Sequence, residues 1–373
     1  MHDLTWADEC SHKIKAKLKV VAERNRHKIP YSTKNGIFDD MTENNIYWWT
    51  NGFWGGMMWQ LYHATGDEMY RDIALHVEAQ LDRNLMLHRG MDHDSGFKWL
   101  PTAVANYRLT GNQDSFNRGL LAADNLAGRF NLAGRFIRAW NDSGDGSNAG
   151  WAIIDCLMNL PLLYWAYEET KDPRYLQIAC AHADTAEKYF MREDASVNHI
   201  CVFDPVTGEF LHSLGGQGYG EGSSWSRGQA WAIYGFVLSY LHTKNIRYLG
   251  NAKKIANYFM AGLLPTGHVP VDFRQPADCL LEDSTAACIA ACGMLEIAKV
   301  TEGREGQLYR EAACALLKTL ADTRCDFTTD IDNIVQKCTA AFHDEKHEFA
   351  IIYGDYFFIE AIFKLTGEEL FIW

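Results

Sequence analysis

Two aspartates in this sequence combine residue types that suit acid catalysis. Asp155 lies in the apolar string IIDCL, and Asp94 lies in DHDSGF. Apolar neighbours deprive a carboxyl group of water, which raises its pKa and keeps it protonated as an acid. A second carboxylate nearby pushes the two pKa values apart and gives one proton donor and one charge stabiliser. The pair therefore predicts general acid chemistry, provided that the fold brings the two residues together.

Each of these residues has an alternative interpretation. Asp94 taken alone is better explained as a helix N-cap, because aspartate is favoured at that position. Asp155 is harder to explain structurally, since an aspartate within an apolar helix must be paired or functional. The Asp-His-Asp string also suggests a metal, but such adjacent residues suit tetrahedral or octahedral sites poorly without further ligands. No second His or Cys cluster is evident, so we do not expect a metal.

Aromatic residues are concentrated in the long, irregular segments that surround these aspartates. Flat rings beside a few carboxylates and amides form the usual surface for a sugar, because rings stack on its apolar face. The alternative is that the tryptophans fill the mouth of the fold as packing residues. Seven of the twelve tryptophans belong to this group: Trp48, Trp49, Trp54, Trp140, Trp151, Trp225 and Trp231.

A repeated helix stop predicts the scaffold that positions these groups. Six apolar runs end in a Thr followed by Gly or polar residues: at Thr65, Thr110, Thr170, Thr243, Thr301 and Thr366. Gly or a polar residue ends a helix, and Asp or Asn directly behind it begins the next. Six such hairpins predict a closed ring of inner apolar and outer amphipathic helices, with all long loops at one end. No linker interrupts the chain, so residues 1–373 are expected to form a single domain.

Composition limits the partners and the compartment. The chain has 373 residues with a formal net charge of −13, which argues against nucleic acid because phosphate binding needs a basic face. No apolar run approaches the roughly 20 residues needed to span a bilayer, so no membrane partner is expected. The N-terminal segment lacks the apolar core of a secretory signal. The ten cysteines include no CxxC pair, which predicts a reducing, cytoplasmic location.

Five strings carry a resemblance to a known family: DHDSGF, IIDCLMNLPLL, GSSWSRGQAWAIYGF, EDSTAACIAACGMLE and YGDYFFIEAIF. They resemble the unsaturated glucuronyl hydrolases of glycoside hydrolase family 88 over nearly the whole chain. The resemblance implies an all-α (α/α)6 barrel whose chemistry needs no cofactor or metal. It also implies release of a terminal Δ4,5-unsaturated glucuronic acid from the oligosaccharides that polysaccharide lyases produce. The alternatives are an unsaturated rhamnogalacturonyl hydrolase acting on pectin fragments and a non-catalytic sugar-binding barrel.

The resemblance also implies roles for individual residues. Asp155 would protonate C4 of the unsaturated sugar and then help to activate water, and Asp94 would stabilise the developing positive charge. His93, His199, Gln217 and Arg227 would bind polar groups of the sugar. The aromatic residues expected at the substrate are Trp140, Trp231, Phe53, Trp49 and Trp225, of which Phe53, Trp49 and Trp225 could equally be packing residues. Sulfate recognition by His343, Lys346 or His347 is left open, because acidic residues surround them.

Overall fold

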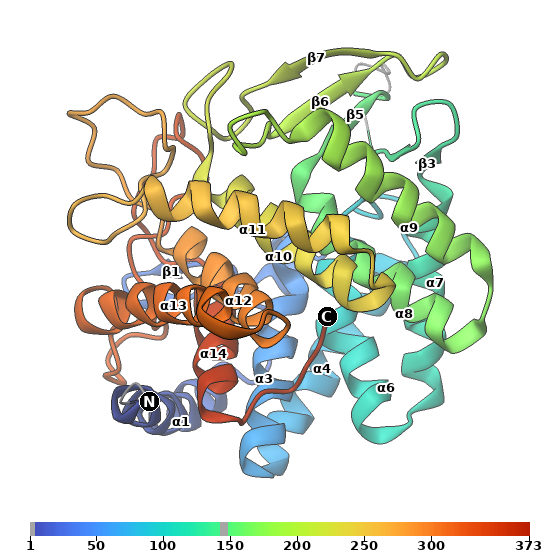
Figure 1. Cartoon of the computed structure of the whole chain (residues 1–373). Coiled ribbons are helices and arrows are strands. Elements are labelled where there is room, and N and C mark those ends of the chain that lie inside the picture. Colours follow the sequence, from blue (N-terminus) through green and yellow to red (C-terminus); the bar gives the residue numbers. More distant parts are fainter. Residues whose placement is uncertain (1–3, 142–147) are drawn as a thin grey trace.

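The computed structural model describes residues 4–141 and 148–373, and helices dominate it (Figure 1). Helices that are buried on most sides alternate along the chain with helices that expose a charged face. The inner set is α3 (Phe53–Thr65), α5, η2 and α6 (Ser95–Trp99, Leu100–Val104, Ala105–Thr110), η3 and α8 (Ile154–Met158, Leu160–Thr170), α10 (Ser226–Thr243), α12 (Ser284–Lys299) and α14 (Ile352–Thr366). The outer set is α1 (Thr5–Arg24), α4 (Glu68–Leu85), α7 (Gln113–Gly128), α9 and η4 (Pro173–Thr185, Ala186–Phe190), α11 (Ile246–Ala261) and α13 (Gly303–Thr323). This alternation confirms the predicted (α/α)6 arrangement.

The apolar patterns explain the two layers. In α12 every residue from Ser284 to Ile297 is buried, as expected for a helix with neighbours on all sides. In α13 the buried residues recur three or four positions apart, which leaves a charged face for solvent. None of the helices in the described part of the chain is long and apolar enough to cross a membrane.

The threonines at the short turns form a recurring hydrogen-bonded unit. Thr65 Oγ1 donates to the carbonyl oxygen of Leu61 at 2.7 Å and accepts from the backbone N–H of Asp67 at 3.2 Å. Asp67 in turn caps the N-terminus of α4 by accepting from Met69 N. Gly66 between them has φ +69°, the left-handed conformation that ends α3. The same threonine bonds recur at three further turns: Thr110, Thr170 and Thr243.

The last marker does not form a hairpin, contrary to the prediction. No helix follows Thr366 among the described residues, and the outer partner of α14 is instead α1, from the start of the sequence (Figure 1). Ser11 Oγ donates to Glu368 Oε2 at 2.5 Å across this junction. The following segment turns back into the centre of the ring. There the fully buried Trp373 stacks on Phe357, with 5.8 Å between the ring centroids.

Small antiparallel sheets were not predicted. The largest joins β5 (Trp151–Ile153), β6 (Ile200–Phe203) and β7 (Phe210–Leu214), at the top of Figure 1. Two ribbons pair β1 (Thr33–Lys34) with β2 (Ile37–Phe38) and β3 (Phe130–Asn131) with β4 (Phe136–Ile137). The long connections supply all these strands, whereas residues 142–147 of one connection lie outside the described residues. Because β5 runs directly into η3, the larger sheet fixes the backbone that carries Asp155.

Candidate active site

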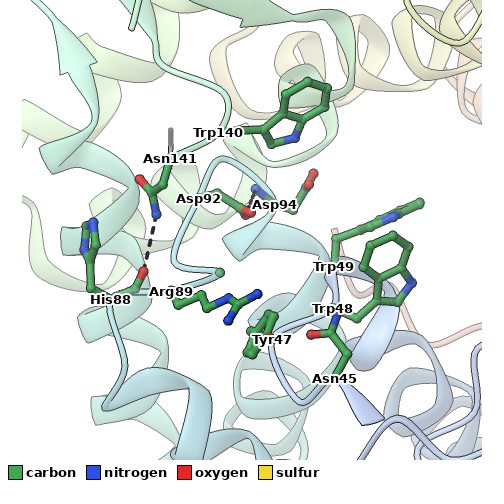
Figure 2. A pocket seen from close by; sticks show the side chains of 11 residues that line it. Asn45, Tyr47, Trp48, Trp49, His88, Arg89, Asp92, Asp94, Trp140 and Asn141 are labelled. Atoms are coloured by element: carbon green, nitrogen blue, oxygen red, sulfur yellow. Dashed lines mark hydrogen bonds between the residues drawn. The ribbon is translucent and has the colours of Figure 1, made fainter. Parts of the chain in front are cut away.

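Three of the long connections meet around a pocket of about 620 Å³ (Figure 2). This volume lies in the range of pockets that hold small molecules. One wall comes from the segment before α3, another from the segment between α4 and α5, and the third from the segment before β5. The lining residues are Asn45, Tyr47, Trp48, Trp49, His88, Arg89, Gly90, Asp92, Asp94, Trp140 and Asn141.

Asp94 lies at the N-cap position of α5, but its side chain does not cap the helix. Its carboxylate instead accepts a hydrogen bond from Asn159 Nδ2 at 3.4 Å and lies 3.4 Å from His93 Nε2. The residue is only 6% exposed, and burial raises the pKa of Asp94 to about 7. Asp92 Oδ1 receives the backbone N–H of Asp94 at 3.0 Å, so a neighbouring carboxylate fixes the turn. The N-cap interpretation therefore does not account for the Asp94 side chain.

Asp155 is the second residue of the short helix η3, which follows directly on β5. Ile154 N donates to the carbonyl oxygen of His199 at 3.0 Å. This hydrogen bond continues the β5–β6 pairing to the first residue of η3. The Asp155 side chain is 14% exposed, and its Oδ2 has no hydrogen-bond partner among the described residues. Burial raises the pKa of Asp155 to about 7; the Asp94 charge adds to this rise and the Arg227 charge opposes it. The charge of Asp94 therefore influences the protonation of Asp155.

Two buried histidines flank these acids in their neutral form. Burial lowers the pKa of His199 to about 3 and the pKa of His93 to about 4. His199 Nδ1 accepts the backbone N–H of Gln217 at 2.9 Å, so its proton is on Nε2. That Nε2 lies 3.7 Å from Asp155 Oδ2. A neutral imidazole thus offers an N–H group beside the acid without a competing positive charge.

Arg227, whose charge acts on Asp155, is held in place by internal contacts. Its Nη1 donates to Asp283 Oδ2 at 2.7 Å and to the carbonyl oxygen of Thr339 at 2.5 Å, and Nη2 donates to Ala340 O. The guanidinium also lies over the Trp225 ring, at 4.5 Å. With 1% exposure, the group is already supplied with acceptors. It ties the first turn of α10 to the connections before α12 and α14 and supplies a fixed positive charge.

Comparisons with known proteins agree with this arrangement. The sequence model of Glycosyl Hydrolase Family 88 matches residues 21–266. The unsaturated glucuronyl hydrolase of Bacillus sp. (strain GL1) is 35% identical over 356 residues, which cover 93% of this chain and 92% of that protein. The chain belongs to Glycosyl Hydrolase Family 88. The unsaturated chondroitin disaccharide hydrolase of Streptococcus pneumoniae (strain ATCC BAA-255 / R6) is 33% identical over 87% of this chain and 83% of its own length.

Solved structures of family 88 enzymes share the fold. The crystal structure of the Bacillus sp. GL1 enzyme, described as responsible for the degradation of glycosaminoglycan, has a TM-score of 0.88 at 33% identity and covers 96% of both chains. A variant of the Streptococcus agalactiae enzyme complexed with dGlcA-GalNAc6S has a TM-score of 0.83 at 29% identity, over 98% of this chain and 93% of that one. The (α/α)6 barrel and the glycoside hydrolase class are thereby established for this chain.

The aromatic residues expected at the substrate divide into two groups in this family 88 enzyme. Trp49 and Trp140 line the pocket. Phe53 and Trp231 are 0% exposed, and Trp225 is 2% exposed, so these three rings pack behind the wall. Phe53 contacts other rings on several sides, including Tyr356 at 5.1 Å. The packing alternative therefore describes Phe53 and Trp225 in this structure, and direct contact of Phe53, Trp225 or Trp231 with substrate stays a prediction.

The basic residues considered for sulfate do not line the pocket. His343 Nε2 contacts the Tyr219 carbonyl oxygen at 2.7 Å, His347 Nε2 contacts that of Phe342 at 2.9 Å, and Lys346 lies over the Phe349 ring. Gln217, expected at the sugar, donates through Nε2 to the Ala340 carbonyl oxygen at 2.9 Å. It therefore joins two loops of the family 88 barrel.

Sequence reasoning missed several lining residues, among them Tyr47, Arg89 and Asn141. Their positions in the long connections were the available signal. It also missed Asn159, whose fully buried amide sits between the two acid-bearing segments. Within residues 4–141 and 148–373, no group of three or more His, Cys, Asp or Glu side chains could hold a metal ion.

Proposed function

We propose that this family 88 enzyme is an unsaturated glucuronyl hydrolase. Its substrate would be the terminal Δ4,5-unsaturated glucuronate on oligosaccharides that lyases release from glycosaminoglycans. The observation that carries the proposal is the pair Asp94 and Asp155, each with a pKa raised to about 7, beside a pocket walled by tryptophans. The names of its relatives from Bacillus and Streptococcus support the substrate class.

The first step is protonation of the substrate double bond. The C4=C5 bond is attached to the ring oxygen and is therefore a vinyl ether. Protonated Asp155 gives its proton to C4, and the π electrons form the new C–H bond. Positive charge then spreads over C5 and the ring oxygen, where ionised Asp94 stabilises it. Neutral His199 leaves the proton of Asp155 in place, because a charged imidazolium would favour its loss.

Water completes the reaction. The oxygen of a water molecule bonds to C5, and its proton passes to the Asp155 carboxylate, which restores the acid. The resulting hemiketal opens by cleavage of the bond between C5 and the ring oxygen, leaving a ketone at C5. The hemiacetal at C1 then collapses to an aldehyde and releases the second sugar. One water molecule is consumed, and no displacement occurs at the anomeric carbon, so the carboxylate spacing rule of ordinary glycosidases does not apply.

The remaining predicted residues enter this proposal in two roles. Trp49 and Trp140 would stack on sugar rings, while the N–H groups of His93 and His199 would bind hydroxyls or hold the acids. Five residues would support the pocket wall from behind its lining: Arg227, Gln217, Trp231, Trp225 and Phe53. We also propose that residues 1–373 form one domain that works in the cytoplasm, which the ten free cysteines support.

A panel of unsaturated disaccharides tests the function. Chondroitin, hyaluronan and rhamnogalacturonan products are incubated with the protein, and loss of the ultraviolet absorbance of the conjugated double bond is followed. We expect loss with the first two. Loss with none of the three overturns the proposal and favours a sugar-binding barrel, and loss with the rhamnogalacturonan product alone assigns the protein to the pectin branch.

A further inference from the structure

One cation on the pocket wall, Arg89, has no ionic partner among the residues that the structure describes. Arg89 is the only Lys or Arg among the described lining residues. Its side chain is exposed, and no carboxylate of residues 4–141 or 148–373 forms an ion pair with it. Its guanidinium lies 4.3 Å from the centre of the Tyr47 ring. Figure 2 shows the Arg89 side chain beside the Tyr47 ring.

The backbone beneath Arg89 is fixed by buried groups. Asn84 Nδ2 donates to the Arg89 carbonyl oxygen at 3.0 Å, and Lys98 Nζ donates to both Gly90 O and Asn84 Oδ1. Gly90 has φ +73°, and a Cβ there would lie 2.3 Å from the Tyr47 Cβ. Only glycine allows this close approach, which brings Arg89 over the ring. The guanidinium is therefore positioned by a built turn and an aromatic surface.

Arg89 belongs to the outer part of the pocket. The reacting sugar must lie against Asp94, which is buried, and Asp155, whose side chain is 14% exposed. The cations that shift the pKa of those acids are Lys98, Arg129 and Arg227, and Arg89 is not among them. Arg129 is also committed, because it donates to the carbonyl oxygens of Arg138, Met91 and Ala139. Because Arg89 is exposed whereas Asp94 is buried, its position favours contact with the released sugar over contact with the unsaturated ring.

We propose that Arg89, stacked on Tyr47, binds an oxyanion, such as a sulfate ester, on the sugar that the reaction releases. The planar guanidinium offers paired N–H donors that match two oxygens of such a group. The neighbouring lining carboxylates, Asp92 and Asp94, would otherwise repel an anionic sugar. This inference rests on the proposed function, since it specifies which disaccharides that site prefers.

The test compares Arg89→Gln with the wild type on unsaturated chondroitin disaccharides that are unsulfated, 4-sulfated or 6-sulfated. We expect kcat/KM for at least one sulfated disaccharide to fall roughly tenfold, mainly through KM, because a charge-assisted hydrogen bond is lost. The unsulfated disaccharide should change less than about twofold. Arg89→Lys should recover part of the loss. Arg304→Gln, which removes an exposed arginine on α13 outside the pocket lining, is the matched control.

Each outcome decides between the two proposals. An equal loss on all three disaccharides overturns the inference, because Arg89 would then serve the unsaturated ring or the fold. Unchanged kinetics on every disaccharide overturn it as well. A wild-type protein that cleaves none of them overturns the proposed function instead.

Discussion

The amide of Asn159 holds the carboxylate of Asp94 from the neighbouring inner helix. Its Nδ2 is 3.4 Å from Asp94 Oδ1 and 3.3 Å from the carbonyl oxygen of Asp155, while its Oδ1 accepts Phe97 N at 2.8 Å. One side chain therefore links both segments that carry acids. Because the hydrogen bond favours the charged form, it lowers the pKa of Asp94 and opposes the effect of burial.

Replacement of Asn159 should narrow the pH range over which kcat is high. In Asn159→Ala the pKa of Asp94 rises, so the carboxylate that stabilises positive charge is lost at a higher pH and the acid limb of kcat moves upward. We expect kcat at pH 7 to fall roughly 10- to 100-fold, since the acids also lose their spacing. Asn251→Ala, at a buried asparagine on α11, is the control for simple loss of a buried amide. An equal change in both variants would argue against a positioning role.

Asp155→Asn should bind substrate and fold but lose turnover. The amide cannot donate a proton to C4, so kcat should fall roughly 10³-fold. The control is Asp355→Asn, because burial also raises the pKa of Asp355 to about 7 while its carboxylate accepts backbone N–H groups of Ile334 and Val335 away from the pocket. Activity of Asp155→Asn near that of the wild type would remove Asp155 from its role.

The basic limb of the pH profile should report Asp155. With a pKa of about 7, the acid loses its proton above neutrality, and kcat should fall about tenfold per pH unit beyond that point. The charge of Asp94 raises the pKa of Asp155. The residual activity of Asp94→Asn should therefore have its basic limb at lower pH than the wild type. A limb that stays in place would show that the two groups do not interact.

The same acids should make the fold less stable as the pH rises. In the folded chain their pKa is about 7, against an ordinary 3.8, so the folded state binds their protons more tightly. Each carboxyl makes its full contribution to the free energy of unfolding below about pH 4. That contribution falls between pH 4 and 7, by ~1.4 kcal/mol per pH unit. Urea unfolding at pH 8 should show Asp155→Asn to be more stable than the wild type by roughly 2–4 kcal/mol, with little difference at pH 4. A variant that is less stable at pH 8 contradicts this account.

The buried pair Arg227 and Asp283 should be essential to the fold. Arg227→Met leaves the fully buried Asp283 without its ionic partner, which should lower the free energy of unfolding by roughly 3–5 kcal/mol. The double variant Arg227→Met with Asp283→Asn should recover part of that loss, because no unpaired charge remains. Denaturant unfolding measures both. Full stability in the single variant would instead favour a role for Arg227 in substrate binding alone.

The helical scaffold could be predicted because its signals are local. A threonine, a residue suited to the left-handed conformation and an N-capping Asp or Asn act within a few residues, as at Thr65 to Asp67. The sequence also indicated both acids, since the apolar neighbours of Asp155 predict burial. The closure of the ring by α1 was not visible, because it depends on contacts between the two ends of the sequence.

The sequence could not predict which aromatic rings line the pocket and which are buried behind its wall. Trp49 and Phe53 lie four residues apart in one apolar segment, yet Trp49 lines the pocket and Phe53 is fully buried. The same residue types serve both purposes, and the packing of other inner helices decides between them. The pairing of β5 with β6 was missed for a related reason, since it joins residues about fifty positions apart.

The junction between α1 and α14 has a consequence for synthesis on the ribosome. Lys15 and Ser11 of α1 both bind Glu368, which lies more than three hundred residues further along the chain. During translation, more than three hundred residues must follow α1 before α14 can cover its apolar face. The ring can close only after Glu368 has emerged from the ribosome, so the apolar face of α1 lacks its α14 partner until that point.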